Sequence, residues 1–265
     1  MKVVILCGGK GTRLGSSTET IPKTLALVSG KPIIWHIMNM YARYGFNEFI
    51  LPLGFGGDKI KEYFWDYEWK NCDFTKELGS DKVTFLSKPN NLKVTFIDTG
   101  IDTMTGGRIK KAQEYIGNES FMLTYGDGVS NVNIPELIKS HKESRKLVTM
   151  TAVQPSGKFG ALAIKDDNMI TSFIEKPKGD KSWINGGFFV CEPKAFDYIQ
   201  NGDSTIWERQ PLEALAKAQQ LNAFKHGGFW QPMDTLRDKM ELTNLWTSGK
   251  APWALWQQQE LQLTK

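Results

Sequence analysis

The chain has 265 residues, of which 40% are apolar and 23% charged, as is typical of a globular protein. The formal net charge of +4 is too small to favour nucleic acid or a membrane surface as a partner. The length suits one large α/β domain, so we expect a single domain over residues 1–265.

The cysteines and the apolar runs exclude further classes of protein. Cys7, Cys72 and Cys191 are widely separated and show no Cys-x-x-Cys spacing, which argues against a disulfide framework and a zinc site. No apolar run approaches the roughly 18 residues that a membrane span needs. The first apolar run is also too short for a signal peptide. We therefore expect a cytoplasmic protein.

Strand-like and helix-like stretches alternate along the chain. This order favours an α/β fold with a mostly parallel, Rossmann-like sheet flanked by helices. Apolar runs predict strands at residues 3–7, 48–53, 121–125, 148–153, 184–191 and 221–224. Residues 82–87 and 93–98 alternate like hairpin or edge strands, and residues 159–164 and 169–175 flank a turn that predicts a small hairpin.

Apolar residues at helical spacing predict the helices. They cover residues 32–44, 58–69, 108–116, 134–145, 211–220 and 235–246, with a further helix from Pro193. Residues 102–107 are predicted to form a turn. The tail over residues 249–265 contains Pro252, Trp253 and Trp256 and is apolar for a free end. We expect this C-terminal segment to pack on the body or on a neighbouring subunit.

The most informative segment is Gly8-Gly9-Lys10-Gly11-Thr12-Arg13, which follows directly on the first strand. Glycines let the backbone curl around an anion and point successive N–H groups at it. Arg13, and Lys23 shortly after, add positive charge for phosphates. The dinucleotide fingerprint fails because Leu14 stands where its last glycine should be, and no P-loop Ser or Thr follows a Gly-Lys pair here. The segment predicts a nucleoside triphosphate loop, with an ordinary glycine-rich turn as the alternative.

Several further polar segments follow strand-like stretches. Ligands of open α/β sheets lie at the carboxyl ends of the strands, so we expect these segments to share one site with the glycine loop. They are residues 126–128, 175–176 and 230–234.

Two isolated carboxylates in these segments could hold a metal ion. Asp127 lies between two glycines, and Asp234 follows an aromatic stretch. Magnesium usually takes one or two protein carboxylates and completes its coordination with phosphate and water. The pair therefore predicts a metal–triphosphate site, although Gly-Asp-Gly taken alone is more often a turn.

Other groups could contact the substrates. Lys176 could hold the phosphate of a second substrate and Glu175 its hydroxyls, unless both lie in a solvated turn before Pro177. Asn185 stands beside glycines inside a strand, where a ligand can approach closely. Residues 102–108 could read a base or ribose, or form a capped turn.

With these residues in view, the chain resembles the sugar-1-phosphate nucleotidyltransferases, and within them the glucose-1-phosphate cytidylyltransferase branch. The superfamily signature is residues 8–14 (GGKGTRL) with the downstream Pro22-Lys23. The segments typical of the cytidylyl branch are residues 31–36 (KPIIWH), 98–100 (DTG), 102–108 (DTMTGGR), 125–129 (YGDGV), 183–189 (WINGGFF), 228–237 (GFWQPMDTLR) and 249–253 (GKAPW). The resemblance covers about residues 1–256.

The resemblance implies an activity and its site residues. The reaction is CTP plus glucose 1-phosphate giving CDP-glucose and pyrophosphate, with Mg²⁺, on a route toward dideoxy sugars of bacterial surface polysaccharide such as O-antigen. Members are typically homo-oligomers, often hexamers. The residues that it implies for nucleotide binding are Leu6, Gly8, Gly9, Gly11, Thr12, Arg13, Lys23, Thr103, Gly107, Arg108 and Asp127. For the sugar phosphate they are Tyr125, Glu175, Lys176, Asn185 and Gly186, for the metal Asp127 and Asp234, and for catalysis Arg13, Lys23 and Asp127.

The chain departs from the family pattern just after Lys23. Thr24 stands where proline is usual, Leu27 where an acid is usual, and Cys7 where alanine is usual. The lysine itself is retained. Two other functions stay open: the same reaction with UTP or dTTP, and a catalytically silent subunit that binds nucleotide to regulate a partner.

Overall fold

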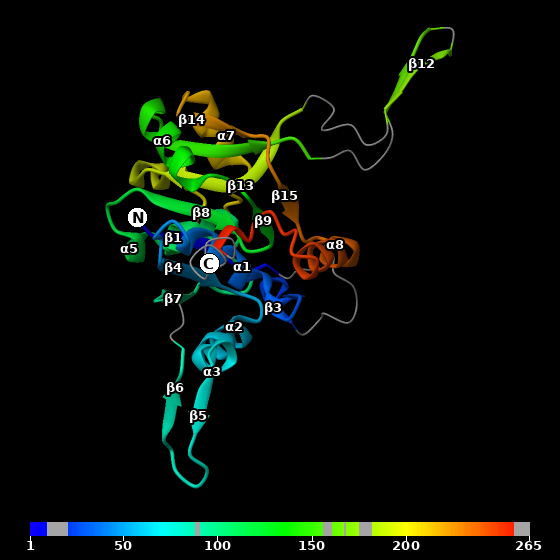
Figure 1. The fold of residues 1–265 in the computed structure, drawn as a ribbon. Helices are drawn as coiled ribbons and strands as arrows, with labels where there is room; N and C mark the ends of the chain where they lie inside the picture. The colour runs from blue at the N-terminus through cyan, green and yellow to red at the C-terminus, as the bar shows by residue number, and fades with distance from the viewer. Residues whose placement is uncertain (10–20, 88–90, 156–160, 167, 175–181, 257–265) are drawn as a thin grey trace.

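A seven-stranded sheet forms the centre of the molecule, in the strand order β14-β10-β13-β8-β1-β4-β7 (Figure 1). The computed structural model describes residues 1–9, 21–87, 91–155, 161–166, 168–174 and 182–256. The sheet strands are β1 (Val3–Leu6), β4 (Glu48–Leu53), β7 (Lys93–Asp98), β8 (Phe121–Tyr125), β10 (Val148–Val153), β13 (Ile184–Cys191) and β14 (Leu221–His226). Only β13 runs antiparallel to its neighbours, so the predicted mostly parallel α/β sheet is confirmed.

Helices cover both faces of the sheet because its central strands are apolar on both sides. In β1, Val3 and Ile5 belong to one buried cluster and Val4 to the other, as the alternation of side chains along a strand requires. The helices are α1 (Ile33–Ala42), α2 (Gly57–Trp65), α3 (Tyr67–Asn71), α4 (Thr105–Lys111), α5 (Gln113–Ile116), α6 (Ile134–Ser144), α7 (Gln210–Lys217) and α8 (Leu236–Thr247). Short 3-10 helices occupy Lys23–Leu25, Pro193–Tyr198 and Gly202–Ser204.

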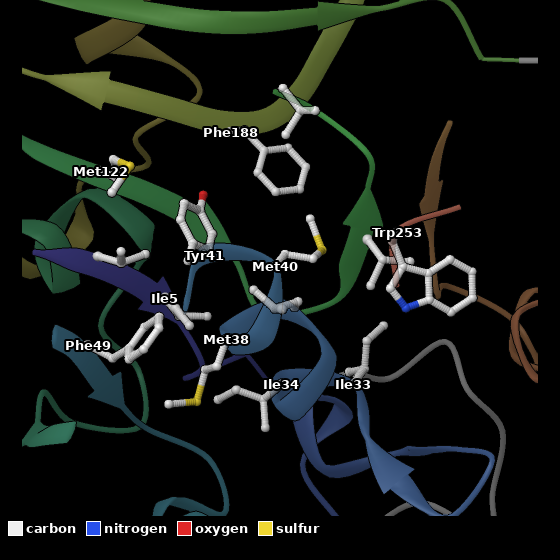
Figure 2. Close-up of a cluster of buried hydrophobic side chains, with 14 of the residues drawn as sticks. Ile5, Ile33, Ile34, Met38, Met40, Tyr41, Phe49, Met122, Phe188 and Trp253 are labelled. Atoms are coloured by element: carbon white, nitrogen blue, oxygen red, sulfur yellow. The ribbon is translucent and has the colours of Figure 1, made fainter. Parts of the chain in front are cut away.

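The larger buried cluster lies between α1 and the sheet (Figure 2). Figure 2 shows Ile34 and Met38 of α1 on the side of Ile5 of β1 and Phe49 of β4, with Ile33 on the side of Trp253. Ile5, Ile33 and Ile34 are fully buried. The apolar spacing that predicted a helix here therefore marks the face that packs on the sheet.

One predicted helix and one predicted turn differ from the structure. The stretch 58–69 forms two helices, because the chain leaves helical geometry at Asp66 (φ −94°, ψ 16°). This break allows the rings of Phe64 and Tyr67 to stack at a centroid distance of 5.9 Å. The predicted turn at 102–107 is shorter than expected, since α4 begins at Thr105.

Among the described residues, four short strand pairs lie outside the main sheet. They are β2 (Leu27–Val28) with β3 (Lys31–Pro32), β5 (Phe74–Lys76) with β6 (Val83–Phe85), β9 (Gly128–Ser130) with β15 (Trp230–Pro232), and β11 (Ala161–Ile164) with β12 (Ile170–Ile174). The stretch 82–87 thus pairs with β5, which the sequence patterns did not predict, while β7 is an edge strand parallel to β4. The β5–β6 hairpin extends away from the sheet (Figure 1).

The described part of the C-terminal segment packs on α1. Trp253 is 1% exposed, and its indole Nε1–H donates to Nδ1 of His36 at 3.3 Å. The ring of Trp246 lies 4.5 Å from that of His36, edge to face. Within the described residues, no helix combines the length and apolarity needed to cross a membrane.

Candidate active site

The carboxyl ends of β1 and β8 open into a cavity of about 490 Å³. The cavity is lined by Leu6, Cys7, Gly8, Gly9, Lys23, Thr24, Ile101, Asp102, Thr103, Met104, Thr105, Arg108, Tyr125, Gly126, Asp127 and Asp234. Five separate stretches of the chain contribute to it, as the position of ligands in open α/β sheets predicts.

Lys23 joins the two carboxylates in this cavity. Its ammonium Nζ lies 2.5 Å from Asp127 and 2.7 Å from Asp234. Burial lowers the pKa of Lys23, but the charges and hydrogen bonds of Asp127 and Asp234 more than offset this, so the pKa lies above its ordinary value. Lys23 is therefore a cation at neutral pH.

Backbone pairing explains why residues so distant in the sequence meet. Asp127 directly precedes β9, and β15 pairs with β9 so that Pro232 lies opposite Gly128. The N–H of Met233 donates to the carbonyl of Asp127 at 2.8 Å, which brings Asp234 beside Asp127. The chemistry of the pair fits a divalent cation. Within the described residues no cluster of three or more metal-binding side chains occurs, so such a cation would complete its coordination with phosphate and water.

Arg108 lies buried beneath the start of the glycine loop. Its guanidinium donates to the carbonyls of Leu53 and Gly8 and to the hydroxyl of Thr99. Burial lowers the pKa of Arg108, with nearby thiol and carboxyl groups acting in the opposite sense. The side chain is 4% exposed, so it connects the ends of three strands rather than reaching into the cavity as a mobile side chain. Its charge nevertheless borders the cavity.

The turn at residues 101–105 forms another wall. The hydroxyl of Thr103 donates to the carbonyl of Thr99 at 2.5 Å, and the N–H of Met104 donates to the carbonyl of Asp203 at 2.8 Å. Gly107 lies behind this turn, where a Cβ would stand only 2.8 Å from the Cα of Asp203. Glycine at this position lets α4 approach the 202–205 segment.

Tyr125 and Asn185 meet at the end of β8. The amide of Asn185 donates to the Tyr125 hydroxyl at 3.1 Å and its oxygen accepts from the N–H of Gly187 at 2.8 Å. Gly186 packs against the backbone of Thr151, where a Cβ would stand 2.9 Å from the carbonyl oxygen. Tyr125 lines the cavity, whereas Asn185 and Gly186 are not among the residues that line it.

Comparison with known proteins identifies the family of this chain. The nucleotidyl transferase family model matches residues 2–231. The chain belongs to the nucleotidyl transferase family. It is 48% identical to the probable glucose-1-phosphate cytidylyltransferase of Bacillus subtilis (strain 168), covering 97% of this chain and 100% of that protein. It is 49% identical to the glucose-1-phosphate cytidylyltransferase of Salmonella typhimurium (strain LT2), with the same coverage.

Solved structures agree with this membership. The nucleotidyl transferase resembles HddC from Yersinia pseudotuberculosis complexed with GMP-PN at a TM-score of 0.67 and 26% identity, over 92% of this chain and 99% of the other. UDP-glucose pyrophosphorylase complexed with UDP-glucose, at 16% identity, shares the fold with a TM-score of 0.66.

The structure brings together most of the predicted site residues that it describes. Leu6, Gly8, Gly9, Lys23, Thr103, Arg108, Tyr125, Asp127 and Asp234 line the cavity. Gly11, Thr12, Arg13, Glu175 and Lys176 lie outside the described residues, and their roles stay predictions. Sequence reasoning missed Glu208, whose carboxylate accepts from the hydroxyl of Tyr125 at 2.6 Å. No motif surrounds Glu208, so only its position in the fold identifies it.

Proposed function

We propose that this nucleotidyl transferase transfers a cytidylyl group from CTP to α-D-glucose 1-phosphate, giving CDP-glucose and pyrophosphate. One observation carries the proposal: full-length identity of 48–49% to proteins named glucose-1-phosphate cytidylyltransferase. The geometry supports it, because a lysine, two carboxylates and the two described glycines of the loop, Gly8 and Gly9, border one cavity.

The chemistry requires little beyond positioning and charge. A phosphate oxygen of glucose 1-phosphate attacks the α-phosphorus of CTP in line with the departing pyrophosphate. This nucleophile is already an anion, so no general base is needed, and catalysis comes from alignment and charge neutralisation. Arg13 and Lys23 would supply positive charge at the phosphates.

Asp127 and Asp234 would hold Mg²⁺, which supplies charge neutralisation on the triphosphate when bound. Both carboxylates form ion pairs with Lys23, and within the described residues no other cation pairs with them. We infer that Lys23 leaves the pair when the metal–triphosphate complex binds. Its ammonium then turns to the α-phosphate or the sugar phosphate.

The remaining walls would bind the two substrates. Thr103, Gly107 and Arg108 belong to the turn and helix that we assign to the base and ribose. Tyr125, Glu175, Lys176, Asn185 and Gly186 are assigned to the sugar phosphate, with Asn185 and Gly186 acting through the wall that Tyr125 forms.

We further propose a homo-oligomer, and a hexamer as its form. The support is an apolar surface on and beside the β5–β6 hairpin, where Trp65 is 87% and Leu78 92% exposed. The proposed cellular role is the supply of CDP-glucose to dideoxy sugars of surface polysaccharide. We place the protein in the cytoplasm.

The test uses purified protein with Mg²⁺ and glucose 1-phosphate, and each of CTP, UTP, dTTP and ATP in parallel. Pyrophosphate release confined to CTP is the expected result. Pyrophosphate release with UTP or dTTP, but not with CTP, would show that the enzyme catalyses the same reaction with another pyrimidine nucleotide. No release with any nucleotide would favour a silent regulatory subunit.

A further inference from the structure

Glu208 connects two walls of the cavity. One carboxylate oxygen, Oε1, accepts from the Tyr125 hydroxyl at 2.6 Å, and the other, Oε2, accepts from the Thr105 hydroxyl at 2.7 Å. Tyr125 ends β8 on the side assigned to the sugar, and Thr105 begins α4 on the side assigned to the nucleotide. Both Tyr125 and Thr105 line the cavity.

The hydrogen bonds fix the orientation of both hydroxyl groups. The Tyr125 hydroxyl gives its single proton to Glu208 and accepts from the Asn185 amide at 3.1 Å. The Thr105 hydroxyl gives its proton to Glu208 and accepts from the N–H of Trp207 at 2.9 Å. Burial raises the pKa of Tyr125, and the negative charge of Glu208 raises it further, so the phenol keeps the proton that this bond requires.

The segment that carries Glu208 is itself bound to the nucleotide side. The carbonyl of Thr205 accepts from the N–H of Gly106 at 2.9 Å, and that of Asp203 accepts from the N–H of Met104 at 2.8 Å. A Cβ at Gly106 would stand 2.9 Å from the Thr205 carbonyl oxygen, so these two backbones are in close contact. Trp207, the neighbour of Glu208, is 1% exposed in the core. Glu208 therefore extends from a fixed base rather than from a free loop.

We propose that Glu208 is a positioning residue that couples the nucleotide side of the cavity to the sugar side through Thr105 and Tyr125. The inference rests on the proposed function, since it concerns how that site holds two substrates at once. Each half of the connection is a charge-assisted hydrogen bond, the stronger kind in proteins. Loss of the Glu208 carboxylate removes the hydrogen bonds to both walls, whereas loss of the Thr105 or the Tyr125 hydroxyl removes only one of them.

This difference defines the experiment. KM and kcat are measured for CTP and for glucose 1-phosphate in the wild type and in Glu208→Ala, Glu208→Gln, Tyr125→Phe and Thr105→Val. Glu208→Ala should raise both KM values about tenfold, the size expected for losing hydrogen bonds to a charged group. Tyr125→Phe should raise mainly the KM for glucose 1-phosphate, and Thr105→Val mainly that for CTP. Glu208→Gln, which keeps one acceptor oxygen, should fall between the wild type and Glu208→Ala.

Glu136→Ala is the matched control, because Glu136 is an exposed residue of α6 that does not line the cavity. Thermal unfolding of each variant separates binding effects from loss of fold. A Glu208→Ala enzyme with unchanged KM values, or with only one of them changed, would overturn the coupling.

Activity of the wild type distinguishes the two proposals. If another nucleotide replaces CTP, the proposed base choice fails and the same KM pattern is measured with that nucleotide. If no nucleotide supports turnover, both proposals fail.

Discussion

Lys23 and Asp234, 211 residues apart in the sequence, form an ion pair of 2.7 Å inside the cavity. The same ammonium also binds Asp127, so one positive charge faces two negative ones. In the function that we propose, these two carboxylates hold a divalent metal and the lysine lies close to the phosphates.

Lys23 and Asp127 should each be essential for turnover. We expect Lys23→Ala and Asp127→Ala to lower kcat by about two to three orders of magnitude, as when one preorganised charge is removed from a transition state. A coupled pyrophosphate-release assay measures the effect. Lys139→Ala, on the exposed surface of α6, is the control. A near-normal kcat for either variant would show that the substituted residue is not needed for catalysis.

Lys23 should also weaken metal binding in the absence of nucleotide. Removing its charge leaves the two carboxylates without their bound cation. We expect Lys23→Met to bind Mn²⁺ about tenfold more tightly than the wild type, because charges at this distance interact by about a kcal/mol or more even in water. Electron paramagnetic resonance titration of free Mn²⁺ gives the dissociation constants. Asp234→Asn should bind Mn²⁺ more weakly than the wild type. Equal affinity of the wild type and Lys23→Met would contradict competition between the lysine and the metal.

Arg108 should contribute strongly to stability. Its planar guanidinium donates hydrogen bonds to acceptors at the ends of three strands. A lysine ammonium cannot reproduce that geometry. We expect Arg108→Lys to lower the free energy of unfolding by about 2 kcal/mol or more, since buried acceptors lose their donors. Urea denaturation measures this, with Arg237→Lys on exposed α8 as the control. A change no larger than that of the control would show that the buried hydrogen bonds are dispensable.

His36 should make stability depend on pH. Burial lowers the pKa of His36 from 6.5 to about 4, and the neutral ring accepts from Trp253 at 3.3 Å. Because the unfolded state binds the proton more readily, this contribution is complete above pH 6.5 and is lost as pH falls toward 4. Between pH 7 and pH 5 the loss should be about 2 kcal/mol.

The matched variant is His36→Gln, whose amide oxygen can still accept from Trp253. Denaturant unfolding of both proteins at pH 7 and pH 5 isolates the histidine, since all other titrating groups are shared. Equal pH dependence in the two proteins would refute the assignment.

The fold was largely predictable because its central strands are continuous apolar runs. The strands β1, β4 and β8 are buried on both faces of the sheet. Such short, continuous apolar sequences suit a central strand and few other elements. The break at Asp66 could not be predicted, because the stretch 58–69 contains no glycine or proline to mark the end of a helix.

The candidate site was predictable to the extent that glycines mark it. Gly8 and Asp127 stand in motifs, and parallel strands bring their carboxyl ends to one edge of the sheet. The buried position of Arg108 and the role of Glu208 depend on contacts between residues about 100 positions apart, such as Arg108 with Gly8. Local sequence contains no signal for such contacts.

The most direct test of the central claim follows the phosphates of CTP into the products. The enzyme is incubated with Mg²⁺, glucose 1-phosphate and CTP labelled with ³²P at either the α- or the γ-phosphate. The account predicts α-label in CDP-glucose and γ-label in pyrophosphate, in equal amounts and only when glucose 1-phosphate is present. Label that appears instead in CMP or free phosphate, or no turnover of CTP, would contradict it.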